Sequence, residues 1–137
     1  MAAAIFSVLV QEIGWGEIIT VDSAGTSSHY IAEPPHPGTT EVLLRHGVLF
    51  QHKARQITKD DLSTFDYIVV MDERNIKDIH FMYGSGRAKV VKLLKFAPHI
   101  PVSDVPDPYF NGDFEGTYQI IRQGAAGLVA HLQRELQ

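Results

Sequence analysis

The chain has 137 residues, of which 45% are hydrophobic and 20% charged, with a formal net charge of −4. This length fits one domain over residues 1–137, and the composition indicates neither disorder nor a low-complexity linker. The acidic balance argues against a general nucleic-acid binder, whose domain would usually be strongly basic. Because the sequence has no cysteine, it also excludes disulfides, thiolate metal sites and a cysteine nucleophile within these residues.

The first ten residues, MAAAIFSVLV, are apolar, but they have no basic segment of a signal peptide and are too few to span a membrane. We therefore expect a cytoplasmic protein without membrane contact. Residues 2–13 fit a short helix or, because they are rich in Ile, Phe and Val, an extended segment. A turn at residues 14–16 then leads into a predicted buried strand over residues 17–21.

Two short helices are expected in the middle of the chain. One begins at Thr39 and ends at Gly47, a residue suited to the left-handed position after a helix. Residues 58–61, Thr-Lys-Asp-Asp, resemble a capping box and predict a short helical turn.

The second half of the chain alternates predicted strands and helices. Residues 65–71 form a nearly continuous apolar run typical of a parallel strand, and Asp72 is suited to cap a helix that runs to about Tyr83. Residues 88–94 are another strand candidate, and apolar spacings of four and three predict a long amphipathic helix over residues 114–132. This alternation predicts an α/β fold with a parallel sheet and functional sites at the carboxyl ends of its strands.

The stretch Val-Pro-Asp-Pro-Tyr-Phe, residues 105–110, holds one acid between two prolines. The prolines restrict Asp107 to extended conformations, so we expect it on a fixed loop, where functional groups tend to lie. A carboxylic acid held against aromatic rings suits general-acid catalysis, because partial desolvation favours its protonated form. The alternative is a loop acid that serves turn chemistry alone.

Six motifs in this order resemble the low-molecular-weight protein tyrosine phosphatase family, particularly its bacterial members, over essentially the whole chain. They are VDSAGT at 21–26, EPPH at 33–36, RHG at 45–47, ARQI at 54–57, FDYIVVMDE at 65–73 and VPDPYF at 105–110. The family opens with a strand and a phosphate-binding loop of the form Cys-x-Gly-Asn-x-Cys-Arg-Ser-Pro, followed by a helix that begins like Met-Ala-Glu-Ala-Ile-Phe. Since this chain begins with MAAAIF, the resemblance implies that the family's first, central strand and its catalytic loop are absent from it.

The resemblance implies a three-layer α/β/α fold and metal-free hydrolysis of phosphotyrosine in proteins, or of small aryl phosphates, through a cysteinyl-phosphate. It assigns the general-acid role to Asp107 and a substrate-flanking role to the rings of Tyr109 and Phe110. The position beside the cleft that is often aromatic in the family aligns with His29 or Tyr30. No cofactor is implied.

Two further residues, Ser23 and His52, correspond to the family's braces of the phosphate-binding loop. The alternatives are a turn-capping serine and a hydrogen-bonded structural histidine. No metal site is expected, because the seven histidines show no paired ligand spacing. The basic run around Lys92 is typical of a solvated face, with docking of an acidic partner as the alternative.

The resemblance therefore implies a chain without nucleophile or phosphate-binding arginine, which we predict to be inactive. A non-catalytic binding module and a truncation product without its own role are the alternatives. A missing central strand would also expose unpaired backbone edges. We expect either that residues 4–10 change role, or that chains form a homodimer or exchange strands to fill the gap.

Overall fold

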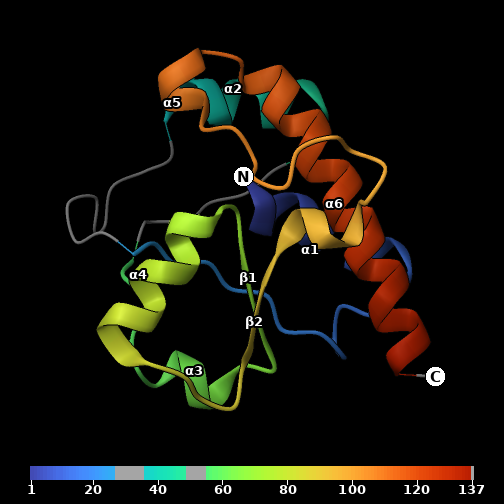
Figure 1. The fold of residues 1–137 in the computed structure, drawn as a ribbon. Coiled ribbons are helices and arrows are strands. Elements are labelled where there is room, and N and C mark those ends of the chain that lie inside the picture. Colours follow the sequence, from blue (N-terminus) through green and yellow to red (C-terminus); the bar gives the residue numbers. More distant parts are fainter. Residues whose placement is uncertain (27–35, 49–54, 137) are drawn as a thin grey trace.

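The computed structural model describes residues 1–26, 36–48 and 55–136, except the side chain of Tyr109 (Figure 1). Helix α1, Ala2–Glu12, opens the chain and buries Ala4, Ile5 and Val10. Three consecutive alanines, the best helix formers, help explain why this segment is helical despite its strand-prone Ile and Val residues. Of the two alternatives for residues 2–13, the helix is therefore confirmed and the extended segment is wrong.

The other helices follow the predicted order, with two additions. They are α2 Pro37–Arg45, α3 Asp61–Thr64, α4 Glu73–Tyr83, the 3-10 helix η1 Leu93–Phe96, α5 Pro108–Asn111 and α6 Phe114–Glu135. Gly47 has a φ of 73°, as predicted for a residue that follows a helix. Asp72 and Asn75 form a reciprocal capping box at the start of α4, which confirms the predicted cap.

The sheet of the described residues has two parallel strands, β1 Tyr67–Val70 and β2 Lys89–Lys92 (Figure 1). The strand predicted over residues 65–71 is thus confirmed in its centre. The strand predicted over residues 88–94 ends early, because the chain turns into η1 and buries Leu93 and Leu94 there.

Residues 17–21 do not form the predicted strand. In Figure 1 they run as an irregular trace behind the sheet, and Ile18 is 62% exposed. The nearest approach to strand pairing in this part of the chain is an isolated parallel bridge between Gly25 and Gln56. The prediction fails for a physical reason: a parallel strand needs a neighbour to satisfy its backbone, and the described residues supply none here.

Two apolar cores lie on opposite faces of the sheet and confirm the α/β fold. The first joins α1, α2, η1 and α6, and Val69 and Met71 pack against it. The second joins α3, α4 and β1, and contains Val70 with Ile68 packed against it. Because side chains alternate along a strand, β1 contributes to both cores and separates two helical layers.

Helix α6 is the longest helix of the part of the chain that the structure describes. Neither α6 nor any other described helix is long and apolar enough to cross a membrane.

Candidate functional site

The acid loop, residues 104–110, lies at the carboxyl end of β1. The Val105 N–H donates to the Met71 carbonyl oxygen at 2.9 Å, and the Val105 side chain is buried. Residue 105 follows η1 in the chain, so this hydrogen bond brings the loop back across the end of the sheet. The loop therefore lies at the edge where functional groups of a parallel sheet are expected.

A three-residue ionic cluster fixes the start of this loop. Lys92 Nζ, at the end of β2, lies 2.9 Å from Asp104 Oδ1 and 3.0 Å from Glu73 Oε2 at the start of α4. The Glu73 N–H also donates to Asp104 Oδ1, at 3.2 Å. Hydrogen bonds with Asp104 and then Glu73 raise the pKa of Lys92, and Lys92 in turn lowers the pKa of Asp104. The cluster joins strand, helix and loop three residues before Asp107.

Asp107 is exposed and immediately precedes α5. Its backbone oxygen accepts from the N–H groups of Phe110 and Asn111, at 3.1 and 3.3 Å, so it starts the helical turn. Pro108 occupies the first helical position, where its fixed φ is favourable. The predicted fixed loop is therefore a loop that leads into one helical turn, a feature that the Pro-Asp-Pro pattern permits but does not specify.

The aromatic rim of the loop differs in part from the expectation. Phe110 is 90% exposed, so its ring does not shield Asp107 from water. Tyr109 lies in α5, and its side chain is outside the description. Because Asp107 and Phe110 are both exposed, this part of the loop suits contact with an external group rather than a closed apolar pocket.

Ser23 lies in a separate segment that a second ionic cluster fixes. Its N–H donates to Asp22 Oδ1 at 2.7 Å. Asp22 also receives Arg55 Nη2 at 3.1 Å, and Arg55 Nη1 lies 3.0 Å from Asp61 Oδ2. The hydrogen bond to Asp61 contributes most to a raised pKa of Arg55. The pKa of Asp61 is lowered. Partial burial alone would raise this pKa, but the hydrogen bonds from Arg55 and Thr58 outweigh the effect of burial.

The remaining predicted site residues, His29, Tyr30 and His52, lie outside the described residues. A backbone hydrogen bond joins Phe110 to Asp107, and Ser23 lies in a segment held by Arg55. Sequence reasoning missed Lys92, which it assigned to a solvated run. A charged residue at the end of an apolar parallel strand is the signal that could have found it.

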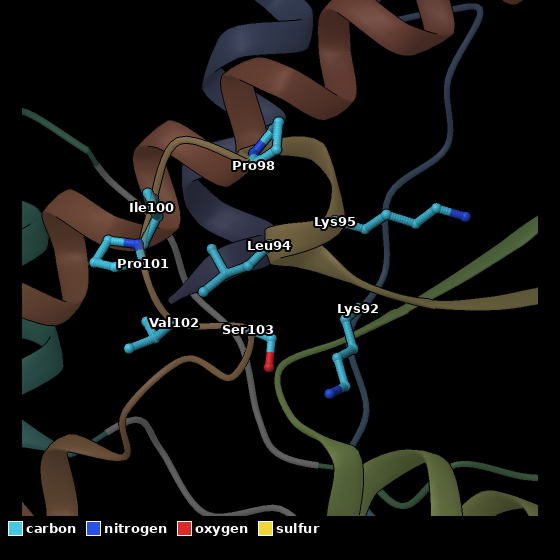
Figure 2. A pocket seen from close by; sticks show the side chains of 8 residues that line it. All are labelled: Lys92, Leu94, Lys95, Pro98, Ile100, Pro101, Val102 and Ser103. Carbon is cyan, nitrogen blue, oxygen red and sulfur yellow. The ribbon is translucent and has the colours of Figure 1, made fainter.

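A hollow of about 390 Å³ lies beside the Lys92 cluster, between the end of β2, η1 and residues 98–103. Figure 2 shows Lys92 extending toward the start of α4, while Leu94 and Val102 line the hollow near the start of α1. Asp107 is not among its lining residues. Among the described side chains, no group of three or more His, Asp or Glu residues is placed to hold a metal ion.

Comparison with known proteins identifies the family. The family model of the low molecular weight phosphotyrosine protein phosphatase matches residues 1–137. The phosphatase YfkJ of Bacillus subtilis is 41% identical over 139 residues, which cover 100% of this chain and 89% of the relative. PtpA of Staphylococcus aureus (strain bovine RF122 / ET3-1) is 36% identical over 119 residues, which cover 85% of this chain and 75% of the relative. Both are named low molecular weight protein-tyrosine-phosphatases.

Solved structures agree with this assignment. The crystal structure of YfkJ has a TM-score of 0.95 at 40% identity, covering 99% of this chain and 87% of that one. A Drosophila arginine phosphatase has a TM-score of 0.84 at 28% identity, covering 96% of this chain and 87% of that one. The predicted resemblance and α/β fold are confirmed, and the chain belongs to the low molecular weight phosphotyrosine protein phosphatase family.

Proposed function

We propose that this chain carries the leaving-group side of a protein tyrosine phosphatase site. Asp107 is the general acid, and Tyr109 and Phe110 form the rim that contacts the aryl group of a phosphotyrosine protein or of a small aryl phosphate. The observation that supports this proposal most directly is the exposed carboxylate on a loop tied to the carboxyl end of the sheet.

The proposed chemistry is proton donation to the departing phenol oxygen. A positioned acid of this kind contributes about 10² to 10⁴-fold to a rate. Asp107 and Phe110 are both exposed and lie within one helical turn, so we propose that an aryl phosphate against the ring places its leaving oxygen near this acid.

The nucleophilic side of the reaction has no candidate in this chain. The 137 residues contain no cysteine, and a serine would need an adjacent base and a phosphate-binding loop. Loss of backbone donors and arginine around the phosphoryl oxygens costs about 3–4 kcal/mol or more of transition-state stabilisation. We therefore propose that these residues alone do not turn over phosphate esters.

The finer assignments stay predictions. They are the bracing roles of Ser23 and His52, the cleft position at His29 or Tyr30, the cytoplasmic location, and the homodimer or strand exchange.

A non-catalytic binding module is the second candidate, and the 90% exposure of Phe110 beside an anchored acid favours it. Saturable binding of a phosphotyrosine peptide without hydrolysis, lost in Phe110→Ala, would support this candidate. Without a phosphate-binding loop, we expect weak affinity that does not distinguish a phosphorylated from an unphosphorylated peptide.

The decisive experiment extends the chain with the strand and Cys-x5-Arg loop of a family member and measures hydrolysis of p-nitrophenyl and phenyl phosphate. We expect activity in the extended protein, and in its Asp107→Asn variant a loss of about 10² to 10⁴-fold that is larger for phenyl phosphate, the poorer leaving group. Asp66→Asn, at an exposed carboxylate away from the loop, serves as the control. Equal rates for Asp107→Asn and the control would contradict the proposed acid.

A further inference from the structure

Helix α4 has one side in a core and the opposite side in solvent. Its inner side buries Ile79 in the second core, together with α3 and β1. Figure 1 shows α4 across the sheet from α6, at the outside of the molecule. Because residues three and four apart share one side of a helix, the exposed residues Arg74, Lys77 and Phe81 lie in a row on its outward side. We call these three residues the α4 row.

Phe81 is the most exposed large apolar residue of the described part of the chain, at 91%. Its ring therefore keeps nearly all the apolar surface that burial against a partner would remove from water. Single exposed apolar side chains are common on proteins, so exposure alone does not indicate a binding site. What distinguishes Phe81 is its place beside two cations, because aromatic residues and Arg supply much of the binding energy at protein interfaces.

The α4 row carries positive charge on an acidic chain. The ion pairs of α4 with described residues are Arg74–Asp78, at 4.0 Å, and Glu73–Lys92, at 3.0 Å. Lys77 takes part in neither, and the Arg74 side chain remains 89% exposed. Because Glu73 pairs with Lys92, Asp78 is the acid of α4 that offsets the two cations. The row is thus a basic patch on a chain with a formal net charge of −4, and it complements a negatively charged partner.

We propose that the α4 row is a docking site for an acidic, amphipathic helical segment of a partner protein. The apolar side of this segment covers Phe81, and its carboxylates pair with Arg74 and Lys77. Anchors at positions i, i+3 and i+7 are a recurring way in which a helix is recognised. The inference concerns binding and does not rest on the proposed catalytic function.

An anionic lipid surface is the competing occupant, and the charge count disfavours it. Lipid recognition uses clusters of about 4–8 Lys or Arg residues. The α4 row supplies two cations beside one acid, on a chain whose net negative charge is repelled by such a surface. An acidic protein segment needs fewer cations, because its apolar side also gains contact with the ring.

The test is a titration of the 15N-labelled chain with a synthetic peptide, followed through the backbone amide shifts. The probe is an amphipathic helix of Leu, Ala and Glu, with Leu along one side and Glu beside it. The control peptide has Gln in place of every Glu. We expect saturable shifts confined to α4 and its ends, with α6 unchanged, and binding that weakens as the salt concentration rises. The Gln peptide should bind at least about tenfold more weakly.

Four exposed positions supply matched variants. Phe81→Ser should weaken probe binding by about tenfold or more, whereas Leu44→Ser, at a 55% exposed apolar residue of α2, should leave it unchanged. Lys77→Glu should weaken binding by about tenfold, whereas Lys95→Glu, at an exposed lysine of η1, should not. Because all four side chains are exposed, urea unfolding should be unchanged in each variant, so a loss of binding reports the contact itself.

Three outcomes would overturn the proposal. Absence of shifts in α4, or equal binding of the Glu and Gln peptides, would show that the α4 row does not select an acidic segment. Binding to vesicles of phosphatidylcholine and phosphatidylserine in equal parts, lost in Phe81→Ser and without peptide binding, would identify a lipid surface as the occupant. Self-association in sedimentation that Phe81→Ser abolishes would identify a second copy of the chain.

Discussion

Two apolar segments with similar strand-forming character reach different structures in this chain. Residues 67–70, YIVV, form β1 and pair with β2 in register. Residues 17–21, EIITV, form no strand and leave Ile18 62% exposed. The difference shows that strand propensity is expressed only where a partner edge exists, because an isolated strand cannot satisfy its backbone.

The contrast extends to the acid loop, which lies at the carboxyl end of β1, and to residues 22–26, which follow residues 17–21. The acid loop after β2 is held by the Lys92 cluster and by a backbone hydrogen bond to Met71. Residues 22–26 are joined to the rest of the structure mainly through residues 55–57, by the Gly25–Gln56 bridge and the Arg55 ion pairs. Substitutions near the acid loop and substitutions near residues 22–26 should therefore have separable effects on stability.

The largest loss of stability is expected at Gly127, where α6 packs against η1. A Cβ at this position would collide with the Phe96 carbonyl, so Gly127→Ala should push η1 away from α6 and lower the free energy of unfolding by about 1–3 kcal/mol. Urea unfolding measures this change. Ala126→Ser, at an exposed site one residue earlier, is the control, and an equal effect of both would contradict the close packing.

A smaller loss of stability is expected at Arg55, whose ion pairs help to hold residues 22–26. Arg55→Ala removes both ion pairs of a side chain that is one-third exposed, so the loss of stability should be about 1 kcal/mol. Amide exchange at Gly25 and Ile57, which bond across this junction, should accelerate while β1 amides stay unchanged. Arg74→Ala, at an 89% exposed side chain, is the control. Faster amide exchange in β1 would show that this junction and the sheet are not energetically separable.

The Lys92 cluster should respond to pH in a defined window. The pKa of Asp104 is lowered, so its contribution is present above the ordinary carboxyl pKa and is lost as the pH falls through the depressed value. The pKa of Lys92 is raised, so its contribution is present below the ordinary lysine pKa and is lost as the pH rises through the raised value.

The chemical shift of the Glu73 amide proton, which donates to Asp104, reports the acid limb of this window. In Lys92→Met, this titration should move toward the ordinary carboxyl range, and the Val105 amide should exchange faster. Lys95→Met, an exposed lysine beside the same hollow, should change neither. An unchanged titration of Asp104 in Lys92→Met would show that Lys92 does not anchor the acid loop.

The smallest effect is expected at Tyr67, where β1 meets α6. Its hydroxyl donates to Glu135, and this hydrogen bond, together with partial burial, raises the pKa of Tyr67 to about 12. The neutral phenol therefore stabilises the fold below the ordinary tyrosine pKa, and this contribution is lost as the pH rises toward the raised value. Ultraviolet titration should show late ionisation of Tyr67, which Glu135→Gln shifts to lower pH. No shift would contradict the hydrogen bond.

The sequence predicted the helices and the paired strands from periodicity and local signals. The Asp72 cap and the left-handed Gly47 depend on neighbouring residues alone, so they were predicted correctly. Residues 2–13 stayed ambiguous because Ala favours helix while Ile and Val favour strand, and burial of Ile5 against α6 belongs to the tertiary structure. The strand predicted over residues 17–21 does not form, because the described residues supply no partner strand for it.

The candidate site was predicted less completely than the fold. The Pro-Asp-Pro pattern placed Asp107 outside regular structure, and the structure puts it directly before α5. The pattern could not show that Lys92 anchors the loop, because that contact joins residues far apart in the sequence. The exposure of Phe110 likewise depends on how α5 is oriented relative to the core, which is a property of the tertiary structure.

The central claim is that these residues hold a general acid without a nucleophile. The measurement that tests it most directly is hydrolysis of p-nitrophenyl phosphate by the purified 137-residue chain beside Asp107→Ala. We predict that neither protein exceeds the rate in buffer. Turnover by the chain that is lost in Asp107→Ala would show that a nucleophile exists among these residues, and would contradict the account.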